Sequence, residues 1–283
     1  MGLLTLLQGC SAIQLGYNNG ATFAHTYISS QIDLEPEQSA LLKDKLKGLI
    51  EWHRANELPL IAKQLREVQA VMSSTAASPQ KITPLQVAEL NKSFQGTLTR
   101  SAEQIAPALA ELLLTLNPSQ MKGLQQNIEE SNESYRDKWM PSNKSKRLQV
   151  AAEGMEKRLE RWYGKLNDEQ KLLIQEWAAS KPDDADHKYA VRIEQQKTFL
   201  KLATQAANRQ ITQTELSAEL IKWVQNWQTK REVNKGLKAM ADQDRTVQLV
   251  VDVSNIANAK QRKHAAERAG GWAEDFAQLA NKK

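Results

Sequence analysis

The stretch Leu166-Asn167-Asp168-Glu169-Gln170 decides the fold, because it contains the signals with which a helix begins. The Asn167 side chain can accept a hydrogen bond from the amide three positions on, and the Gln170 side chain can accept one from the amide of Asn167. The apolar Leu166 in front of this capping box can pack against the first turn as a hydrophobic staple. The stretch therefore predicts a helix that begins after Asn167.

The same pattern occurs four more times as an apolar residue, a capping residue, two variable residues and then Gln or Glu. These copies are residues 34–38, 82–86, 116–120 and 211–215. Three of them place proline at the first helical position, where its missing amide hydrogen costs nothing. Because their spacing is irregular, we interpret them as one helix-start motif that is used repeatedly, which excludes a solenoid repeat of fixed period.

Apolar residues at spacings of three and four follow these starts, as on one face of an amphipathic helix. Leu216, Leu220, Trp223 and Trp227 form such a face. Glycine (12) and proline (8) are scarce in the 283 residues, which argues against a turn-rich β protein. We therefore predict an all-α fold, a multi-helix bundle of about eight or nine amphipathic helices. The narrow apolar faces are also typical of an elongated bundle whose helices stay partly exposed.

Breaks between helices are predicted at several places, none of which is a long Gly/Ser linker. They are residues 73–81, 140–144, 180–186 and 241–244 and the pair Gly270-Gly271, and at Pro107 either a break or a kink is expected. Residues 10–283 are therefore expected to form a single helical domain without an internal boundary. Residues 247–253 are rich in β-branched side chains, a composition typical of a strand. Because no partner strand is predicted elsewhere, we predict that residues 247–253 form a helix.

A short apolar run at the N-terminus ends in Leu7-Gln8-Gly9-Cys10. These four residues resemble the lipobox of bacterial lipoproteins, whose signal is cleaved before the cysteine. The cysteine is then acylated on its thiol and its new amine, with chains such as palmitate, and two or three chains suffice for stable anchoring. The resemblance implies that Cys10, the only cysteine, is the lipid attachment site and that residues 1–9 are a residual signal.

The residues around this lipobox carry two further expectations. Residues 1–9 contain no Lys or Arg, and the apolar run is shorter than the core of about 7–15 residues typical of a secretory signal. We therefore expect the signal to be truncated and the translation start to lie upstream of Met1. Ser11 follows the cysteine, and in Gram-negative lipoproteins a residue other than Asp there accompanies sorting to the outer membrane. The alternative is a cytosolic protein with a chance Gly-Cys pair.

Positive charge is concentrated in residues 136–165. The chain has 38 Lys and Arg against 33 Asp and Glu, a net charge of +5. Residues 136–165 contain nine basic and four acidic residues, so this stretch alone carries a surplus of five. It is interpreted either as a solvated helix face or as a surface for anionic lipid headgroups or another acidic partner. The seven tryptophans are dispersed, so a nucleic-acid partner is not expected.

The residue patterns that carry common catalytic chemistry are not found in the sequence. His25, His53, His187 and His264 do not lie at the spacings of three or four that a helical metal site needs, and no HExxH motif occurs. No glycine-rich phosphate loop and no GxSxG nucleophile motif is found either. We therefore expect no metal, no cofactor and no catalytic residue, and an enzyme is the least favoured class.

Two aromatic clusters stand out from the background. Trp52, His53 and Arg54 are the candidate binding residues, at the predicted end of a helix where Pro59 turns the chain into the next one. They either pack a helix–helix corner, with a cation near the helix C-terminus, or form a binding site. Further on, Gly164 is predicted to end a helix as its C-cap glycine, and Trp162 is predicted to lie in the core.

Several of these segments together resemble one known family. They are residues 13–19, 52–54, 57–59, 160–164 and 166–170. Over residues 10–180 they are similar to proteobacterial lipoproteins classed as a domain of unknown function. This resemblance implies an all-helical outer-membrane lipoprotein that faces the periplasm, and it implies no catalytic residue.

A weaker similarity concerns the starts at residues 116–120 and 166–170. They are similar to the Leu-Thr-x-x-Gln signature of periplasmic chaperones and stress sensors of the Spy/CpxP type, with Asn in place of Thr. The expected function is therefore binding or scaffolding at the outer membrane, with acyl chains in the membrane and other envelope proteins as partners. A chaperone-like or envelope-stress function is the alternative.

Overall fold

The computed structural model describes residues 12–74, 80–141, 143–182, 184–233 and 236–282. Every regular element in these ranges is an α-helix, which confirms the predicted all-α class. The helices are α1 (Ala12–Asn18), α2 (Gly20–Gln31), α3 (Pro36–Asn56), α4 (Leu58–Met72), α5 (Pro84–Leu113), α6 (Pro118–Trp139), α7 (Lys144–Tyr163), α8 (Asp168–Ser180), α9 (Ala185–Ala207), α10 (Gln213–Val233), α11 (Gly236–Asn255) and α12 (Ala259–Ala280).

The predicted number of eight or nine helices is wrong, because these ranges contain twelve. Two additional helices, α1 and α2, lie in a segment that has no capping box to mark their starts, and the Asn19 side chain makes no cap hydrogen bond at the start of α2. Helices α3 and α4 are separated only by Glu57, so the apolar periodicity gives little sign that they are two helices. Helix number was therefore underestimated where one helix follows another almost directly.

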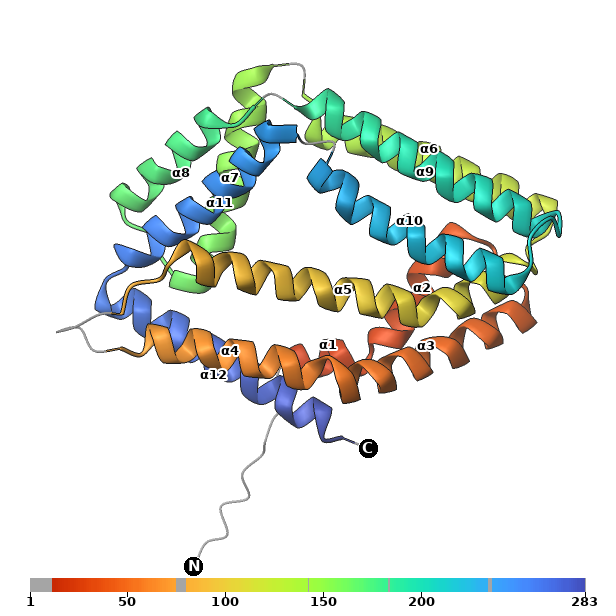
Figure 1. The fold of residues 1–283 in the computed structure, drawn as a ribbon, viewed down its shortest axis with the longest axis horizontal. Helices are drawn as coiled ribbons and strands as arrows, with labels where there is room; N and C mark the ends of the chain where they lie inside the picture. Colours follow the sequence, from red (N-terminus) through yellow and green to blue (C-terminus); the bar gives the residue numbers. More distant parts are fainter. Residues whose placement is uncertain (1–11, 75–79, 142, 183, 234–235, 283) are drawn as a thin grey trace, which may run out of the picture.

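The helices are arranged around two main clusters of buried side chains (Figure 1). One cluster joins α7, α8 and α11 to the end of α4 and the start of α12, and it includes Tyr163, Ile174 and Val253. The other joins α2, α5, α6, α9 and α10, and it includes Leu113 and Leu216. Helices α3 and α4 follow one another along one edge in Figure 1, and α12 lies beside α4.

The predicted capping boxes form in the structure. The side chains of Thr83, Asn117 and Asn167 each accept a hydrogen bond from the amide three positions on, and the backbone amide of each donates in return to Oε1 of the N3 glutamine. Thr212 makes the same exchange with Glu215. A sixth box, in which Asn258 pairs with Gln261, was not predicted. Its signal was weak because the residue before the cap is alanine.

The N3 glutamines at the starts of α3 and α6 bind each other. Gln120 Nε2 donates to Gln38 Oε1 (2.6 Å) and to the carbonyl of Asp33 (2.6 Å). Gln38 Nε2 donates in return to Gln120 Oε1 (3.2 Å) and to the carbonyl of Thr115 (2.9 Å). Each glutamine side chain thus accepts a hydrogen bond from the N-cap amide of its own helix and donates one to a carbonyl in the loop that leads into the other helix.

The starts of α8 and α12 repeat this arrangement. Gln261 Nε2 donates to Gln170 Oε1 (2.8 Å) and to the carbonyl of Lys165 (2.9 Å). Gln170 Nε2 donates to Gln261 Oε1 (3.3 Å) and to the carbonyl of Val253 (3.2 Å). We call Gln38–Gln120 and Gln170–Gln261 the two glutamine pairs. All four side chains are buried, and Gln170 has no exposed surface at all.

Three predicted breaks are wrong. Helix α5 continues through Pro107, because its neighbours Ala106 and Ala110 are buried and packing outweighs one lost hydrogen bond. Helix α12 continues through Gly270 and Gly271; a Cβ on Gly270 would collide with the Gln69 side chain, so this glycine permits close packing of α4 on α12. Helix α11 continues through residues 241–244, which contain neither glycine nor proline.

The other local predictions are confirmed. The predicted breaks at residues 73–81, 140–144 and 180–186 separate α4 from α5, α6 from α7 and α8 from α9, and residues 247–253 are helical. Gly164 follows the end of α7 with a φ of 71°, a conformation that favours glycine. Trp162 is partly buried, with its ring 5.1 Å from that of Trp272. Among the helices that the structure describes, none is long and apolar enough to span a bilayer.

We predict that the buried glutamine pairs contribute more to stability than an exposed capping box does. Gln170→Leu leaves the amide of Asn167 and the carbonyl of Val253 without partners in the core, so we expect a loss of ~3 kcal/mol in the free energy of unfolding. Gln86→Leu removes the same box position at an exposed helix start and should cost at most ~1 kcal/mol. Urea unfolding followed by circular dichroism measures both, and equal losses would contradict the prediction.

Candidate functional site

The predicted lipid attachment site, Cys10, and the lipobox residues Leu7, Gln8 and Gly9 lie outside the described residues. The structure begins two positions after Cys10, where Ala12 opens α1. The structural question is therefore how this first helix is held, because α1 is the part of the fold nearest to the expected anchor.

Trp52, His53 and Arg54 lie in the last turns of α3, as the sequence predicted. The Glu57 amide donates to the carbonyl of His53 (2.9 Å), and α4 begins at the next residue with Pro59 in its first turn. The chain therefore turns a corner directly after the three candidate residues. This corner brings them next to α1, which is far away in the sequence.

Two of the three candidate residues bind α1. The Tyr17 hydroxyl and His53 Nδ1 share a hydrogen bond of 2.9 Å. Arg54 Nη2 donates to Asn18 Oδ1 (2.9 Å), and its guanidinium lies 5.6 Å from the centre of the Tyr17 ring. Trp52 is half-buried, and its carbonyl accepts a hydrogen bond from the Asn56 amide side chain (2.8 Å).

A second contact holds α1 from the other side. Gln14 Nε2 donates to Asp275 Oδ1 (3.0 Å) and to Gln278 Oε1 (2.7 Å), both on α12. Gln14 is itself buried, and Ile13 and Tyr17 pack against an apolar cluster formed by α4 and α12. Helix α1 is therefore fixed to both α3 and α12.

Glu57, the residue between α3 and α4, is the buried member of an ion pair whose other member, Arg100, is exposed. Glu57 is 1% exposed and receives two hydrogen bonds from Arg100 of α5, Nε to Oε1 at 2.6 Å and Nη2 to Oε2 at 2.7 Å. Arg100 Nη2 also donates to Thr97 Oγ1 (3.3 Å). The sequence did not indicate this pair, because its partners are 43 positions apart and neither belongs to a motif that fixes the other.

The environment of the corner shifts three pKa values. Burial raises the pKa of Tyr17 to about 12, against a smaller opposite effect of the Arg54 charge. Burial lowers the pKa of His53, and the negative charge of Glu57 opposes this shift. The hydrogen bond from Arg100 is the main cause that lowers the pKa of Glu57. Near neutral pH the phenol is therefore protonated, the imidazole is neutral and the carboxylate is charged.

His53 and Arg54 contact other parts of the protein at this corner, as the packing interpretation expects. A general base needs a carboxylate or imidazole with a free lone pair facing a substrate. Both Glu57 oxygens face Arg100, and His53 Nδ1 faces Tyr17. Across the described part of the chain, no group of three or more His, Cys, Asp or Glu side chains could hold a metal ion.

An open groove of about 390 Å³ lies between α4 and α12, lined by Gln69, Met72, Lys263 and Glu267 among others. Its most polar side chain, Arg262, is buried and donates to the carbonyl of Val71 (2.6 Å) and to Ser74 Oγ (2.7 Å). Arg262 therefore connects α12 to the end of α4 through Nη2, whereas its buried Nε has no hydrogen-bond partner among the described residues.

Comparison with known proteins identifies one related family. A model described as "Family of unknown function (DUF6279)" matches residues 30–231, more than half of the chain. No curated protein and no solved structure matches the sequence. The matched range contains the Trp52–Arg54 corner, the Glu57–Arg100 pair and the pair Gln38–Gln120. Compared with the resemblance over residues 10–180, it begins later, at residue 30, and extends further, to residue 231, so it does not include Cys10 or residues 13–19.

We predict that His53 makes the stability of the protein depend on pH. Because burial lowers its folded-state pKa below the ordinary 6.5, the unfolded chain binds more protons just below that pH, and stability falls as pH falls. Between about pH 7.5 and about pH 5.5 the wild type should lose up to ~1 kcal/mol more than His53→Gln, since partial exposure of the ring reduces the effect. Urea unfolding at both pH values measures the difference. Equal losses in both proteins would contradict the prediction.

Proposed function

This chain belongs to the DUF6279 family of unknown function, and we propose that it is a lipid-anchored outer-membrane protein that faces the periplasm. In this proposal acyl chains on Cys10 bind it to the membrane, and its helical body binds or scaffolds other envelope proteins. The observation that carries the proposal is the fixed position of α1, directly after the lipid-bearing residue.

The spacing between anchor and fold is the first support. Two residues of chain span at most ~7 Å, so lipid on Cys10 would hold α1 against the membrane surface. Contacts with His53, Arg54 and Asp275 fix α1 to the rest of the fold. The anchor would therefore set the orientation of the whole body, as a scaffold requires, whereas a long flexible linker would leave it free to rotate.

The use of the polar groups at the corner is the second support. Tyr17, His53 and Glu57, which would be the most plausible reactive groups, are engaged with other protein side chains. A protein whose buried polar groups hold its helices together presents its outer surface for function. We therefore place binding or scaffolding ahead of catalysis.

We predict that the chain is acylated in cells and that Cys10 is required for it. The native gene, with any coding sequence upstream of Met1, is expressed in a Gram-negative host grown with an alkyne fatty acid. The wild type should incorporate the label and fractionate with the outer membrane, whereas Cys10→Ser should lose at least ~90% of the label, because stable anchoring needs the acyl chains. Ser11→Ala is the matched control and should keep the label. Equal labelling of wild type and Cys10→Ser would refute the proposed anchor.

A chaperone-like activity is the second candidate, and helix α5 provides the observation in its favour. Phe94 and Leu98 are 39% and 65% exposed and lie one turn apart on this helix. Exposed apolar side chains on one helix face can bind the apolar segments of an unfolded client. The weak similarity to envelope-stress proteins would then reflect a shared chaperone-like activity.

We predict for this candidate that the protein lacking residues 1–10 suppresses aggregation of reduced α-lactalbumin at a several-fold molar excess. Phe94→Ser/Leu98→Ser should reduce the suppression by at least ~3-fold, because the apolar contact is lost. Leu172→Ser removes a 54% exposed leucine of α8 and should change little. Light scattering measures the effect. No suppression by the wild type would exclude this activity.

A further inference from the structure

The N-terminal helices contain no Asp, Glu, Lys or Arg. Residues 12–32, which include α1 and α2, contain no Asp, Glu, Lys or Arg, although these residues make up 25% of the chain. Uncharged surface helices are unusual, because charged side chains normally keep an exposed helix soluble. This segment therefore differs from the rest of the surface.

Large apolar side chains of the same segment point into solvent. Leu15 of α1 is 55% exposed, and Phe23 and Tyr27 of α2 are 61% and 69% exposed. Phe23 and Tyr27 are one turn apart, so their rings extend from the same face of α2. Their neighbours on that face, Thr22 and Thr26, are also exposed and uncharged.

The basic residues 136–165 provide a second feature. Eight of their nine Lys and Arg side chains are exposed, on the end of α6, on α7 and just after it. One of the four acidic residues, Glu156, binds Lys171 of α8 (Nζ to Oε1, 2.8 Å), outside the stretch. Positive charge therefore prevails on this part of the surface.

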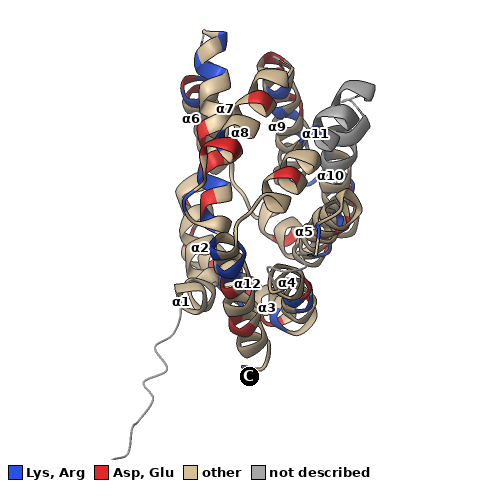
Figure 2. Ribbon diagram, turned by 90° about the vertical axis from the view of Figure 1, so that its left-hand side faces the viewer, with Lys and Arg blue, Asp and Glu red and all other residues tan. Residues whose placement is uncertain are grey.

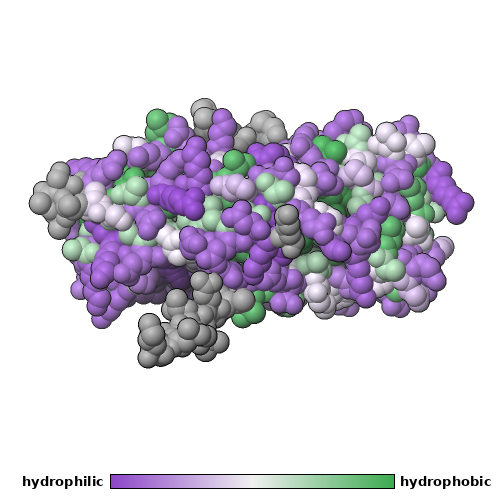
Figure 3. All heavy atoms as spheres, turned by 90° about the horizontal axis from the view of Figure 1, so that it is seen from below, coloured by the Kyte–Doolittle hydropathy of each residue, from purple (hydrophilic) through white to green (hydrophobic). Residues whose placement is uncertain are grey.

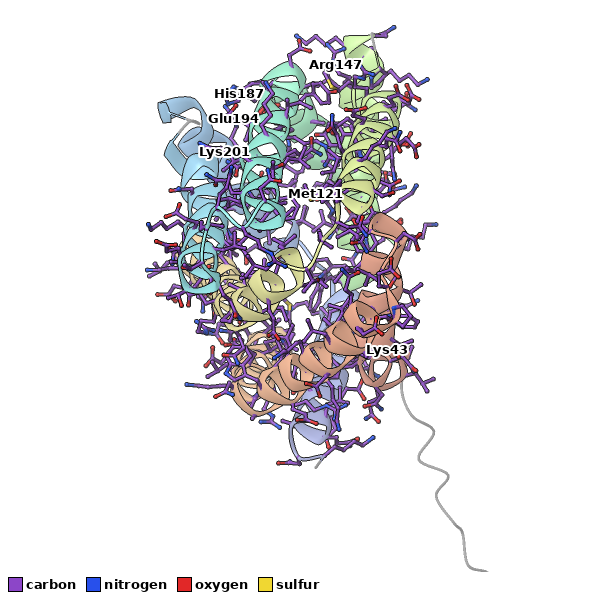
Figure 4. The ribbon with its side chains drawn as sticks, turned by 90° about the vertical axis from the view of Figure 1, so that its right-hand side faces the viewer. Lys43, Met121, Arg147, His187, Glu194 and Lys201 are labelled. Carbon is purple, nitrogen blue, oxygen red and sulfur yellow. The ribbon has the colours of Figure 1, made fainter. Side chains whose placement is uncertain are left out.

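The two features lie on one flank of the molecule. Helices α1, α2, α6 and α7 line the left side in Figure 2. The opposite view agrees, with α2 and the green helix that carries Arg147 on the right of Figure 4. Helices α9 and α10 occupy the other flank in both views.

We infer that this flank is a membrane-contact surface: Leu15, Phe23 and Tyr27 enter the boundary between headgroups and acyl chains of an anionic bilayer, and the basic residues of α6 and α7 bind its headgroups. The inference rests on the proposed lipid anchor and adds to it the orientation of the body. Tyrosine is favoured at membrane interfaces, and basic residues are attracted to anionic lipids.

A bilayer fits this flank better than a protein partner does. A tether of two residues brings α1 to within ~7 Å of the lipid, where a charged helix would have to lose its hydration but an uncharged one would not. The edge formed by α3, α4 and α12, seen in Figure 3, is mostly hydrophilic, with apolar residues in separate small patches. The uncharged α1–α2 segment next to the anchor is thus the surface suited to lipid.

The test supplies the tether chemically, so that it does not depend on acylation in cells. The thiol of Cys10, the only cysteine of the full chain, is coupled to a maleimide lipid in vesicles of phosphatidylethanolamine and phosphatidylglycerol. The photoreactive residue p-benzoylphenylalanine replaces Tyr27, or Leu85 of α5 as the matched control, which is 67% exposed. Crosslinks to lipid are counted by mass spectrometry.

We expect at least ~5-fold more lipid crosslinking at Tyr27 than at Leu85, since the depth of an interfacial side chain places it among acyl chains. We also expect at least ~2-fold less at Tyr27 when phosphatidylcholine replaces phosphatidylglycerol, because the basic residues lose their anionic partner. Equal yields at both positions would overturn the inference, and an unchanged yield in phosphatidylcholine would overturn its headgroup part. In cells, a crosslink from Tyr27 to a protein in place of lipid would also overturn it. Loss of Cys10 acylation in cells would refute the anchor alone.

Discussion

A helix that begins inside a protein leaves amide hydrogens that need acceptors away from water. Here the two glutamine pairs solve this problem for four helices at once. Each Oε1 accepts from its own N-cap amide and from the partner glutamine, as Gln170 Oε1 does from Asn167 and Gln261. Each Nε2 also donates to a backbone carbonyl before or near the start of the partner glutamine's helix. One side chain therefore connects the starts of two helices. These hydrogen bonds join the start of α3 to that of α6 and the start of α8 to that of α12.

The consequences extend from the pairs to the N-terminus. The pair Gln170–Gln261 fixes the start of α12 against α8, and α12 then runs beside α4 with Gly270 at their closest approach. The far end of α12 supplies Asp275 and Gln278, which bind Gln14 of α1. The pair Gln38–Gln120 fixes α3, whose other end supplies His53 and Arg54. The two pairs therefore position both surfaces on which α1 lies.

The local part of this structure could be predicted from the sequence, and the long-range part could not. Capping boxes are contained within five residues, so their helix starts were predicted at Thr83, Asn117 and Asn167. The pairing of their glutamines depends on residues 82 or 91 positions apart and has no local signal. Tertiary packing also overrides local propensity, as at Pro107 and Gly270, where buried neighbours keep helices continuous. At the corner, the position of His53 followed from Pro59, but the Glu57–Arg100 pair and the contact with Tyr17 required the fold.

The distribution of polar groups explains why function is sought on the surface. Burying Gln170 or Glu57 is costly unless its polar atoms find partners, and the partners here are a helix start, a carbonyl and an opposite charge. These groups thereby lose the freedom that a substrate would need from them. The apolar side chains on α1, α2 and α5 show the opposite imbalance, because they leave hydrophobic area in water that burial against lipid or another chain would remove. Among the described residues, exposed apolar area that binding could bury therefore lies on the surface, and part of it, on α1 and α2, is close in sequence to Cys10.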